Sequence, residues 1–272
     1  MFVNETFGQK PLQLAAFFSM GICGLCFLWI RTRSIRNRRR SFLVSAVEAT
    51  GENAVCLKIS SNTKHMLVYL PGQFSFLTFF SNHISKEEHP FSITSAPTRN
   101  TYLEFVVRST GDWTNEIKHL QRGDRVLLNG PFGMFSHLQV PGKKEIIMIA
   151  GGIGITPMLS MLRYMAEHND QRKTTLIWSN RARKHIILPD EFQNLAFQLK
   201  SLRMVHVLTR DPEFNGEKGR LDRPRLQRLL SDCSRSAAIF VCGPHRMMKE
   251  VRRSLVSLRF PRRFIFMEKF NL

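Results

Sequence analysis

The sequence predicts a small antiparallel β-barrel followed by an α/β doubly wound parallel sheet, with one transmembrane helix ahead of both. Three observations carry this prediction: an uncharged apolar run before an arginine cluster, a series of short β-type runs, and a later alternation of strands and helices. The 272 residues are enough for two domains that each bury a core. We expect a membrane and juxtamembrane segment at 1–40, a barrel at 41–142 and the α/β domain at 143–272.

The first element is the segment Leu12–Ile30, which is apolar almost throughout and carries no charge. About 20 apolar residues cross the hydrocarbon core of a bilayer as a helix. Trp29 lies where an interfacial anchor is expected, and a run of arginines from Arg31 to Arg40 follows it. The positive-inside rule places those arginines in the cytoplasm, where they attract anionic lipid head groups. We therefore expect a single-pass protein with membrane lipid as a partner and its domains on the cytoplasmic side.

Charge and cysteine content exclude other classes. The 40 basic and 21 acidic residues give a net charge of +19, but no DNA- or RNA-binding motif is present, so nucleic acid is not an expected partner. The five cysteines form no disulfide framework and no cluster-binding spacing. Cys23 and Cys26 lie inside the apolar segment, where small residues suit a membrane helix better than a redox motif. No metal site is expected.

The barrel is predicted from short runs of branched and aromatic residues. Turn-forming residues separate these runs, as at Pro71-Gly72 and Gly130-Pro131. Short strands at this spacing are typical of a small antiparallel barrel. The expected strands are Phe42–Glu48, Ala54–Ile59, Phe74–Phe79, Phe91–Thr94, Tyr102–Arg108 and Arg125–Leu128.

After Pro141-Gly142 the pattern changes to buried strands that alternate with helices. Such alternation is the signature of a parallel sheet covered by helices. The expected strands are Ile146–Ala150, Thr174–Trp178, Met204–Leu208, Ala237–Val241 and Phe264–Met267. The expected helices begin near Thr156 and cover about 189–199, 224–230 and 244–258.

A glycine turn, Gly151-Gly152-Ile153-Gly154, links the strand Ile146–Ala150 to a helix. Thr156 suits the N-cap and Pro157 the first helical position, where a missing N–H costs nothing. Glycines allow close approach of a phosphate, and the free N–H groups and dipole of a helix start favour negative charge. Pro157 replaces the third glycine of the usual dinucleotide motif, so a tight turn without ligand is the alternative.

Six motifs occur in an order that resembles the ferredoxin–NADP reductase-type flavoenzymes. The His-Pro-Phe-Ser and Gly-Asp-Trp-Thr forms are most similar to the ferric reductase and NADPH oxidase branch. The resemblance covers about 41–272 and implies an FAD-binding barrel and an NAD(P)H-binding α/β domain. The motifs are Pro71-Gly72-Gln73-Phe74, His89-Pro90-Phe91-Ser92, Gly111-Asp112-Trp113-Thr114, Gly130-Pro131-Phe132-Gly133, Gly151–Pro157 and Cys242-Gly243-Pro244.

On the flavin side, the resemblance implies that Ser92 lies beside flavin N5 and that Phe91 packs on the ring. The commoner form of this motif begins with arginine, so His89, followed here by Pro90, implies a weaker and pH-dependent grip on the pyrophosphate. Further FAD contacts are expected from Thr94, Gly111, Trp113 and Thr114. The alternatives are an ordinary strand-end histidine for His89 and core packing for Phe91 and Trp113.

On the nucleotide side, Gly152 and Gly154 are expected to hold the pyrophosphate. Ser179, Asn180 and Arg181 follow the second strand, where a hydroxyl and a guanidinium suit a 2′-phosphate and an acid would favour NADH. We therefore expect NADPH, with NADH possible, while a solvated basic loop is the alternative. The resemblance implies that Cys242, followed by Gly243 and Pro244, borders the nicotinamide, and that Phe270 shields the flavin; a buried structural cysteine is the alternative for Cys242.

The expected reaction is hydride transfer from NAD(P)H to FAD and then release of single electrons, with Ser92, Cys242 and Phe270 as the catalytic residues. The apolar segment contains no histidine that could hold haem. The expected acceptor is therefore haem in a separate membrane subunit, or a small acceptor such as ferric iron or quinone. The alternative from another class is a non-catalytic, membrane-tethered nucleotide-binding sensor or scaffold of the same fold.

Overall fold

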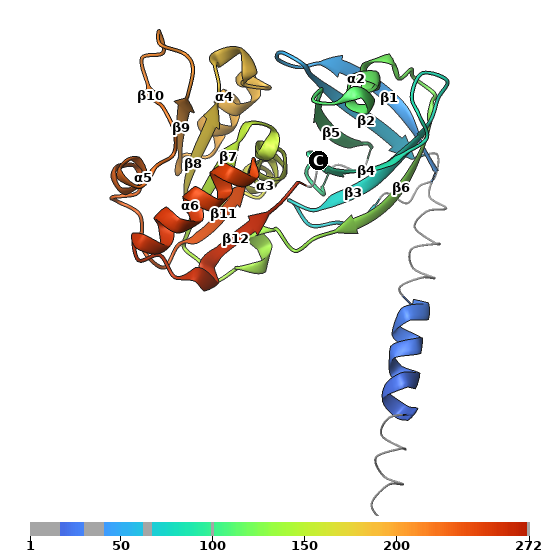
Figure 1. The fold of residues 1–272 in the computed structure, drawn as a ribbon, viewed down its shortest axis with the longest axis horizontal. Helices are drawn as coiled ribbons and strands as arrows, with labels where there is room; N and C mark the ends of the chain where they lie inside the picture. The colour runs from blue at the N-terminus through green and yellow to red at the C-terminus, as the bar shows by residue number, and fades with distance from the viewer. Residues whose placement is uncertain (1–16, 30–40, 62–66, 99–100, 271–272) are drawn as a thin grey trace, which may run out of the picture.

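The computed structural model describes residues 17–29, 41–61, 67–98 and 101–270. Two six-stranded sheets form its body, one antiparallel and one parallel, and they lie side by side (Figure 1). The fold class predicted for these two parts is confirmed. The predicted boundary at Pro141-Gly142 lies in the connection between the last antiparallel strand and the first parallel one.

The antiparallel sheet has the order β4-β3-β6-β1-β2-β5. Its two edge strands approach each other where the backbone N–H of Thr94 donates to the carbonyl of Glu104 at 2.7 Å, which brings the sheet close to a closed barrel. A short helix begins at Asp112 and continues as a 3₁₀ turn over Ile117–His119. The elements are β1 (Ser41–Ala49), β2 (Ala54–Ser61), β3 (Phe74–Phe80), β4 (Glu88–Ser92), β5 (Leu103–Arg108), α2 (Asp112–Glu116) and β6 (Arg125–Phe132).

The parallel sheet has the order β10-β9-β8-β7-β11-β12. Strand order reverses between β7 and β11, and ligands of such sheets bind in the crevice outside the carboxyl ends of the strands at this reversal. Its strands are β7 (Glu145–Gly151), β8 (Lys173–Asn180), β9 (Leu202–Leu208), β10 (Glu217–Lys218), β11 (Ala238–Cys242) and β12 (Ile265–Glu268). Its helices are α3 (Thr156–Glu167), α4 (Pro189–Gln198), α5 (Arg223–Leu229) and α6 (His245–Ser257).

Strand β7 shows why the parallel sheet is covered on both faces. Ile146 and Met148 belong to the core formed with α3 and α4, and Ile147 and Ile149 belong to the core formed with α5 and α6. Successive side chains of a strand point to opposite faces, so a continuous apolar run fills both cores.

Strand β5 contributes to two cores at once. Leu103, Phe105 and Val107 point into the barrel, whereas Val106 packs into the core formed by α3 and α4. Three more barrel-side residues share that second core: Ala54, Cys56 and Phe135. Each buried side chain of valine size contributes about 1.5–3 kcal/mol. The barrel and the parallel sheet are therefore joined by one apolar core and not only by the connecting chain.

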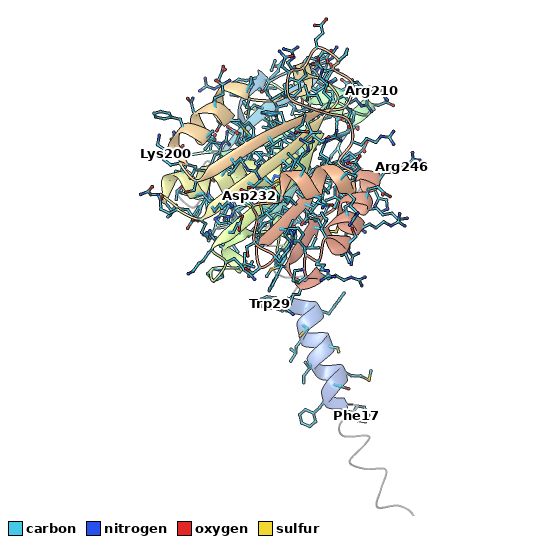
Figure 2. All side chains as sticks on the ribbon, turned by 90° about the vertical axis from the view of Figure 1, so that its left-hand side faces the viewer. Phe17, Trp29, Lys200, Arg210, Asp232 and Arg246 are labelled. Atoms are coloured by element: carbon cyan, nitrogen blue, oxygen red, sulfur yellow. The ribbon has the colours of Figure 1, made fainter. Side chains whose placement is uncertain are left out.

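Residues 17–29 form a helix with apolar side chains pointing outward along its length (Figure 2). Phe17 is 74% exposed and Trp29 is 61% exposed. Within the ranges that the structure describes, no helix has the length and hydropathy needed to span a bilayer. The predicted span Leu12–Ile30 begins and ends outside the described residues, and so does the arginine run from Arg31 to Arg40.

Candidate active site

The glycine turn after β7 packs directly on the Cys242-Gly243-Pro244 turn after β11. A Cβ on Gly154 would lie 2.5 Å from the carbonyl oxygen of Cys242, and one on Gly151 would lie 2.7 Å from Pro244 Cδ. Gly243 adopts φ +150°, and a Cβ on it would lie 2.9 Å from the Gly151 Cα. The contacts at Gly154 are with backbone atoms, so the close approach of the two turns requires glycine there, whereas a Cβ on Gly151 would meet the side chains of Pro244 and Met247.

Gly152 has a different neighbour, which comes from the barrel. Its φ is +54°, in the left-handed region, and a Cβ there would lie 3.0 Å from Arg108 Nη1. Arg108 ends strand β5, so the guanidinium crosses from the barrel to the glycine turn. Of the three glycines, Gly152 is the one that faces a cation across the domain boundary.

The prediction that Thr156 caps α3 is wrong. Residues Gly152–Ile155 form a 3₁₀ turn that continues into the helix, and Thr156 has the helical angles φ −57° and ψ −45°. An N-cap residue needs extended angles, which here belong to Gly151 at φ −120° and ψ 115°. The Thr156 hydroxyl donates to the carbonyl of Ile153 at 3.0 Å. Pro157 is the second residue of α3, one position later than predicted and still in the first turn.

Arg108, beside the glycine turn, and Arg181, near Arg108, are two cations without a carboxylate partner among the described residues. Arg108 Nη2 donates to the His185 carbonyl at 2.8 Å, and the buried Arg108 Nε has no partner. Burial and the charge of Arg181 lower the pKa of Arg108. Within the described ranges neither arginine forms an ion pair. Uncompensated cations beside a left-handed glycine suit a phosphate.

In the loop after β8, Arg181 differs from its basic neighbours in its ion pairing. Arg183 pairs with Asp211 at 3.3 Å and Lys184 with Glu52 at 2.9 Å, so of these cations Arg181 is the one without a counter-charge. Ser179 is half-buried, and Asn180 is 4% exposed with both polar side-chain atoms unpartnered. Unpaired polar atoms at a buried site call for a ligand or water.

The flavin side is formed by the end of β4 and by α2. Ser92 is 7% exposed, and its hydroxyl has no hydrogen-bond partner among the described residues. The Phe91 and Trp113 rings stack with their centroids 6.0 Å apart. His89 lies 4.0 Å from the Trp113 ring, and its Nε2 is 3.0 Å from Glu87 Oε2. The rings of His89, Phe91 and Trp113 lie together, and Phe91 and Trp113 also pack against the barrel core, as in the core-packing alternative. Ser92 follows Phe91 in β4, so its side chain, like that of the exposed Pro90, points to the opposite face of the strand.

Thr94 and Thr114, two of the predicted FAD contacts, already use their side-chain hydroxyls within the protein. The Thr114 hydroxyl accepts from the N–H groups of Thr110 and Gly111 at 3.0 Å and donates to the Gly111 carbonyl. The Thr94 hydroxyl donates to Glu104 Oε1 at 3.0 Å, and the Thr94 carbonyl accepts from Arg163 at 2.8 Å. Thr114 caps its own short helix and Thr94 holds the domain junction, which leaves neither hydroxyl a free donor for a cofactor.

Strand β12 carries a carboxyl group to the crevice. Glu268 pairs in register with Cys242, and its Oε2 would lie 3.8 Å from a Cβ on Gly133 of the barrel. Burial raises the pKa of Glu268, and burial together with the Glu268 charge raises the pKa of the Cys242 thiol. Phe270 packs, partly buried, against the core of α3 and α4. Glu268, in register with Cys242, thus lies near Gly133 of the barrel, and strand β12 runs toward the barrel side of the molecule (Figure 1).

The residues at this junction fit a flavin and a pyridine nucleotide. The barrel offers stacked aromatic rings and the unpaired Ser92 hydroxyl, and the parallel sheet offers Gly152, Arg181 and the unpaired Asn180 amide. Sequence reasoning did not single out Arg108. The available signal was the alternation along β5, which places Glu104 and Arg108 on the same face with Val106 between them.

A basic groove of about 540 Å³ lies apart from this junction, along the outer side of α6 and β12. None of the glycine-turn, flavin-side or β8-loop residues lines it. The lining residues are His245, Met248, Lys249, Arg252, Arg253, Val256, Ser257, Arg262, Met267 and Lys269.

Comparison with known proteins agrees with this arrangement. The FAD-binding domain family matches residues 39–178, just over half of the chain, and the oxidoreductase NAD-binding domain family matches residues 148–253. The chain belongs to the ferredoxin–NADP reductase-type flavoenzymes. It is an FAD-dependent NAD(P)H oxidoreductase of this type, and FAD and a pyridine nucleotide are its cofactors.

Curated relatives of this flavoenzyme are moderately similar and mostly longer. Cytochrome b5 reductase 4 of Mus musculus is 31% identical over 59% of this chain and 32% of its own length. Sulfhydrogenase 1 subunit gamma of Pyrococcus furiosus is 29% identical over 73% of this chain and 67% of its own. The nitrate reductase [NADPH] of Emericella nidulans is 33% identical over 54% of this chain and 19% of its own. The chain spans from about a fifth to about two thirds of these relatives.

Solved structures share the fold of this flavoenzyme. The cytochrome b5 reductase domain of Ulva prolifera nitrate reductase has a TM-score of 0.75 at 20% identity, over 84% of this chain and 97% of that one. A ferredoxin NADP+ reductase from Neisseria gonorrhoeae, with bound FAD and NADP, has a TM-score of 0.70 at 24% identity over the same shares.

Proposed function

We propose that this flavoenzyme takes electrons from NADPH in preference to NADH and delivers them singly, from a membrane-anchored position, to an acceptor held by another molecule. The observation that carries the donor preference is Arg181, which lies near Arg108 and has no carboxylate partner among the described residues. A dianionic phosphate is a ligand that such an arginine would bind well.

The end of strand β8 supports NADPH over NADH. An acidic residue at this point would hydrogen-bond the ribose hydroxyls of NADH. This chain instead has Ser179, Asn180 and Arg181 there, a hydroxyl, an amide and a guanidinium. Arg181 would hold the 2′-phosphate, and Arg108 would hold a phosphate that both nucleotides share, because it reaches the glycine turn from the barrel.

Bound FAD would supply the chemistry of accepting two electrons together and releasing them one at a time. The residues of the chain orient it and exclude water. Phe91 and Trp113 offer apolar faces, and Ser92 offers a hydroxyl with no competing partner in the described part of the chain. Burial keeps the Cys242 thiol neutral and raises the pKa of the Glu268 carboxyl.

For the acceptor we propose haem in a partner membrane protein, with ferric iron or quinone as the competing choices. The relatives include a cytochrome b5 reductase and, in Dictyostelium discoideum, a flavohemoprotein that is 24% identical over 85% of this chain. Their names support electron delivery to haem. The ferric reductase and NADPH oxidase likeness of the His89–Ser92 motif supports the same choice.

For the location we propose that the apolar segment Leu12–Ile30 anchors the protein and that the reductase domains lie in the cytoplasm. The support is the length and apolar character of the segment together with the arginines that follow it. The exposed apolar side chains of residues 17–29 are consistent with burial in lipid.

The deciding experiment is an absorption spectrum of detergent-extracted protein before and after NADPH. We expect a bound flavin whose absorbance is bleached by NADPH at lower concentrations than by NADH. A preparation that takes up no FAD would overturn the activity. Flavin reduction with equal efficiency by both nucleotides would overturn the donor preference alone. Co-purifying haem that becomes reduced would favour the haem acceptor over ferric iron or quinone.

A further inference from the structure

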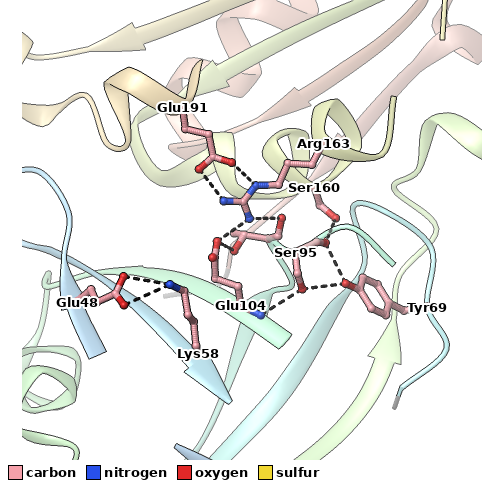
Figure 3. Close-up of polar contacts among 9 residues, drawn as sticks. Glu48, Lys58, Tyr69, Ser95, Glu104, Ser160, Arg163 and Glu191 are labelled. Carbon is pink, nitrogen blue, oxygen red and sulfur yellow. Dashed lines mark hydrogen bonds and ion pairs between the residues drawn. The ribbon is translucent and has the colours of Figure 1, made fainter. Parts of the chain in front are cut away.

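Arg163 of α3 makes two carboxylate contacts, one across the domain boundary and one within its own domain (Figure 3). Its Nη1 donates to Oε1 of Glu104 in the barrel at 2.5 Å. Its Nε and Nη2 donate to Oε1 and Oε2 of Glu191 at the start of α4, at 2.5 and 2.7 Å. The Arg163 and Glu104 side chains are each 5% exposed, so the cross-domain pair is buried.

A buried ion pair is a poor source of stability. Desolvation of the two charges offsets much of their attraction, and apolar replacements of similar volume are often as stable. Burial raises the pKa of the Glu104 carboxyl, but the Arg163 charge and the hydrogen bonds to Glu104 lower it by more. The pKa of Glu104 is therefore below its usual value, and both groups are charged at neutral pH. The pair therefore contributes mainly a fixed geometry between the two elements that carry it.

The two elements are β5, which carries Arg108, and α3, which follows the glycine turn. Glu104 and Arg108 are four residues apart in β5 and share one face, and Arg163 lies two turns after the start of α3, which continues from the glycine turn. The distance between Glu104 and Arg163 therefore constrains the distance between Arg108 and Gly152. Beside the pair, Ser160 donates to the Ser95 carbonyl at 2.7 Å, so the junction is also held by a neutral contact.

We propose that the Glu104–Arg163 pair is a positioning device that sets how closely the glycine turn approaches the barrel, and thereby how the nicotinamide meets the flavin. This inference rests on the proposed function for its catalytic consequence. The Glu191 contact of the same arginine lies within the nucleotide domain and takes no part in that separation. Glu191→Gln is thus a matched control for Glu104→Gln.

Cys56 provides a probe of domain separation that needs no cofactor. It is 4% exposed and packs in the core shared by the barrel and α3. Its labelling by a thiol reagent in cofactor-free protein, located by mass spectrometry, reports opening of that core. We expect labelling at least about 10-fold faster in Glu104→Gln and in Arg163→Gln, and within about twofold of wild type in Glu191→Gln.

The two cross-domain variants separate opening from local electrostatics. The Glu104 charge raises the pKa of Cys56 and the Arg163 charge lowers it. If electrostatics alone governed labelling, Glu104→Gln would speed it and Arg163→Gln would slow it. Acceleration in both variants supports the inference. Opposite changes, or an equal acceleration in Glu191→Gln, overturn it. If either single variant fails to fold, the double variant Glu104→Gln/Arg163→Gln leaves neither of these two groups charged, and faster labelling is expected there.

The catalytic consequence is measured as the rate of flavin reduction at saturating NADPH. We expect a fall of about 10-fold in Glu104→Gln, greater than any change in NADPH affinity, because misplacement by about 1 Å is costly. Glu191→Gln should stay within about twofold of wild type. An unchanged limiting rate in Glu104→Gln overturns the inference. Failure of the wild type to bind FAD would overturn the proposed function instead, and the Cys56 result would still stand.

Discussion

Glu104 and Arg108 project from the same face of strand β5, the first onto Arg163 and the second onto the Gly152 turn. Val106 lies between them and packs into the core of the neighbouring domain. One strand of the barrel therefore presents an acid, an apolar side chain and a base to the nucleotide-binding domain. These contacts and the loop after β8 lead to the predictions that follow.

Arg181→Ala should lower the preference for NADPH over NADH. A hydrogen bond to a charged group is worth about 1.5–3 kcal/mol, so we expect NADPH to bind about 10- to 100-fold more weakly, with little change for NADH. Flavin-reduction kinetics with each nucleotide measure the ratio. Arg183→Ala is the control, because Arg183 is already paired with Asp211 and should alter the ratio less. An unchanged ratio in Arg181→Ala would contradict the assignment.

Arg108→Ala should weaken both nucleotides together. The Arg108 guanidinium faces the glycine turn and not the loop that distinguishes a 2′-phosphate. We expect a loss of about 10-fold or more in affinity for NADPH and for NADH alike. Titration of the oxidised flavoenzyme with each oxidised nucleotide measures this. A loss confined to NADPH would instead place Arg108 on the 2′-phosphate.

Gly154→Ala should destabilise the protein through the contact of two turns. The added Cβ would lie 2.5 Å from the Cys242 carbonyl oxygen, and backbone atoms cannot yield easily. Overpacking of this kind costs about 1–3 kcal/mol, and a domain of this size loses about 2–4 °C in Tm per kcal/mol. Gly142→Ala is the control because no atom lies within 4 Å of its Cβ position. Equal Tm values for the two variants would refute the close-packing explanation.

Glu268→Gln should raise stability at neutral and alkaline pH. Burial raises the pKa of Glu268 above 4.5, so the folded state favours the protonated carboxyl. The associated stability is fully present below that value and is lost as the pH rises through the folded-state pKa. Glutamine stays neutral throughout, so the variant should melt higher than wild type at pH 8 and equally near pH 4. A constant difference in Tm across this range would argue against the titration of Glu268.

Thiol labelling should test the membrane anchor. Cys23 and Cys26 are exposed on the helix of residues 17–29, whereas Cys56, Cys233 and Cys242 are buried. Burial also raises the pKa of Cys56 to about 12, which suppresses its thiolate. In detergent-free solution we expect a maleimide to label Cys23 and Cys26 first. In lipid vesicles a membrane-impermeant maleimide should label neither, and equal labelling with and without vesicles would count against the anchor.

The positions of most strands along the chain could be predicted from the sequence, because period-two and continuous apolar runs directly report burial. The two-residue strand β10 and the pairing order of the strands within each sheet were not predicted. The sequence located the aromatic residues around Ser92 and the basic loop at Arg181 through motifs. It did not predict the 3₁₀ turn before Thr156, since a cap and an interior threonine have the same local sequence. It did not show that Arg108 faces the glycine turn, because the packing of β5 against that turn is a long-range tertiary contact.

The two-faced character of β5 also limits how this protein can be divided. Ala54, Cys56, Val106 and Phe135 belong by sequence to the barrel and by packing to its neighbour. A fragment that ends at the linker would leave this apolar surface open to water and prone to self-association. Chimaeras that exchange one half for that of a related reductase should therefore fold only when the contacting side chains of β2, β5 and α3 are exchanged as a set.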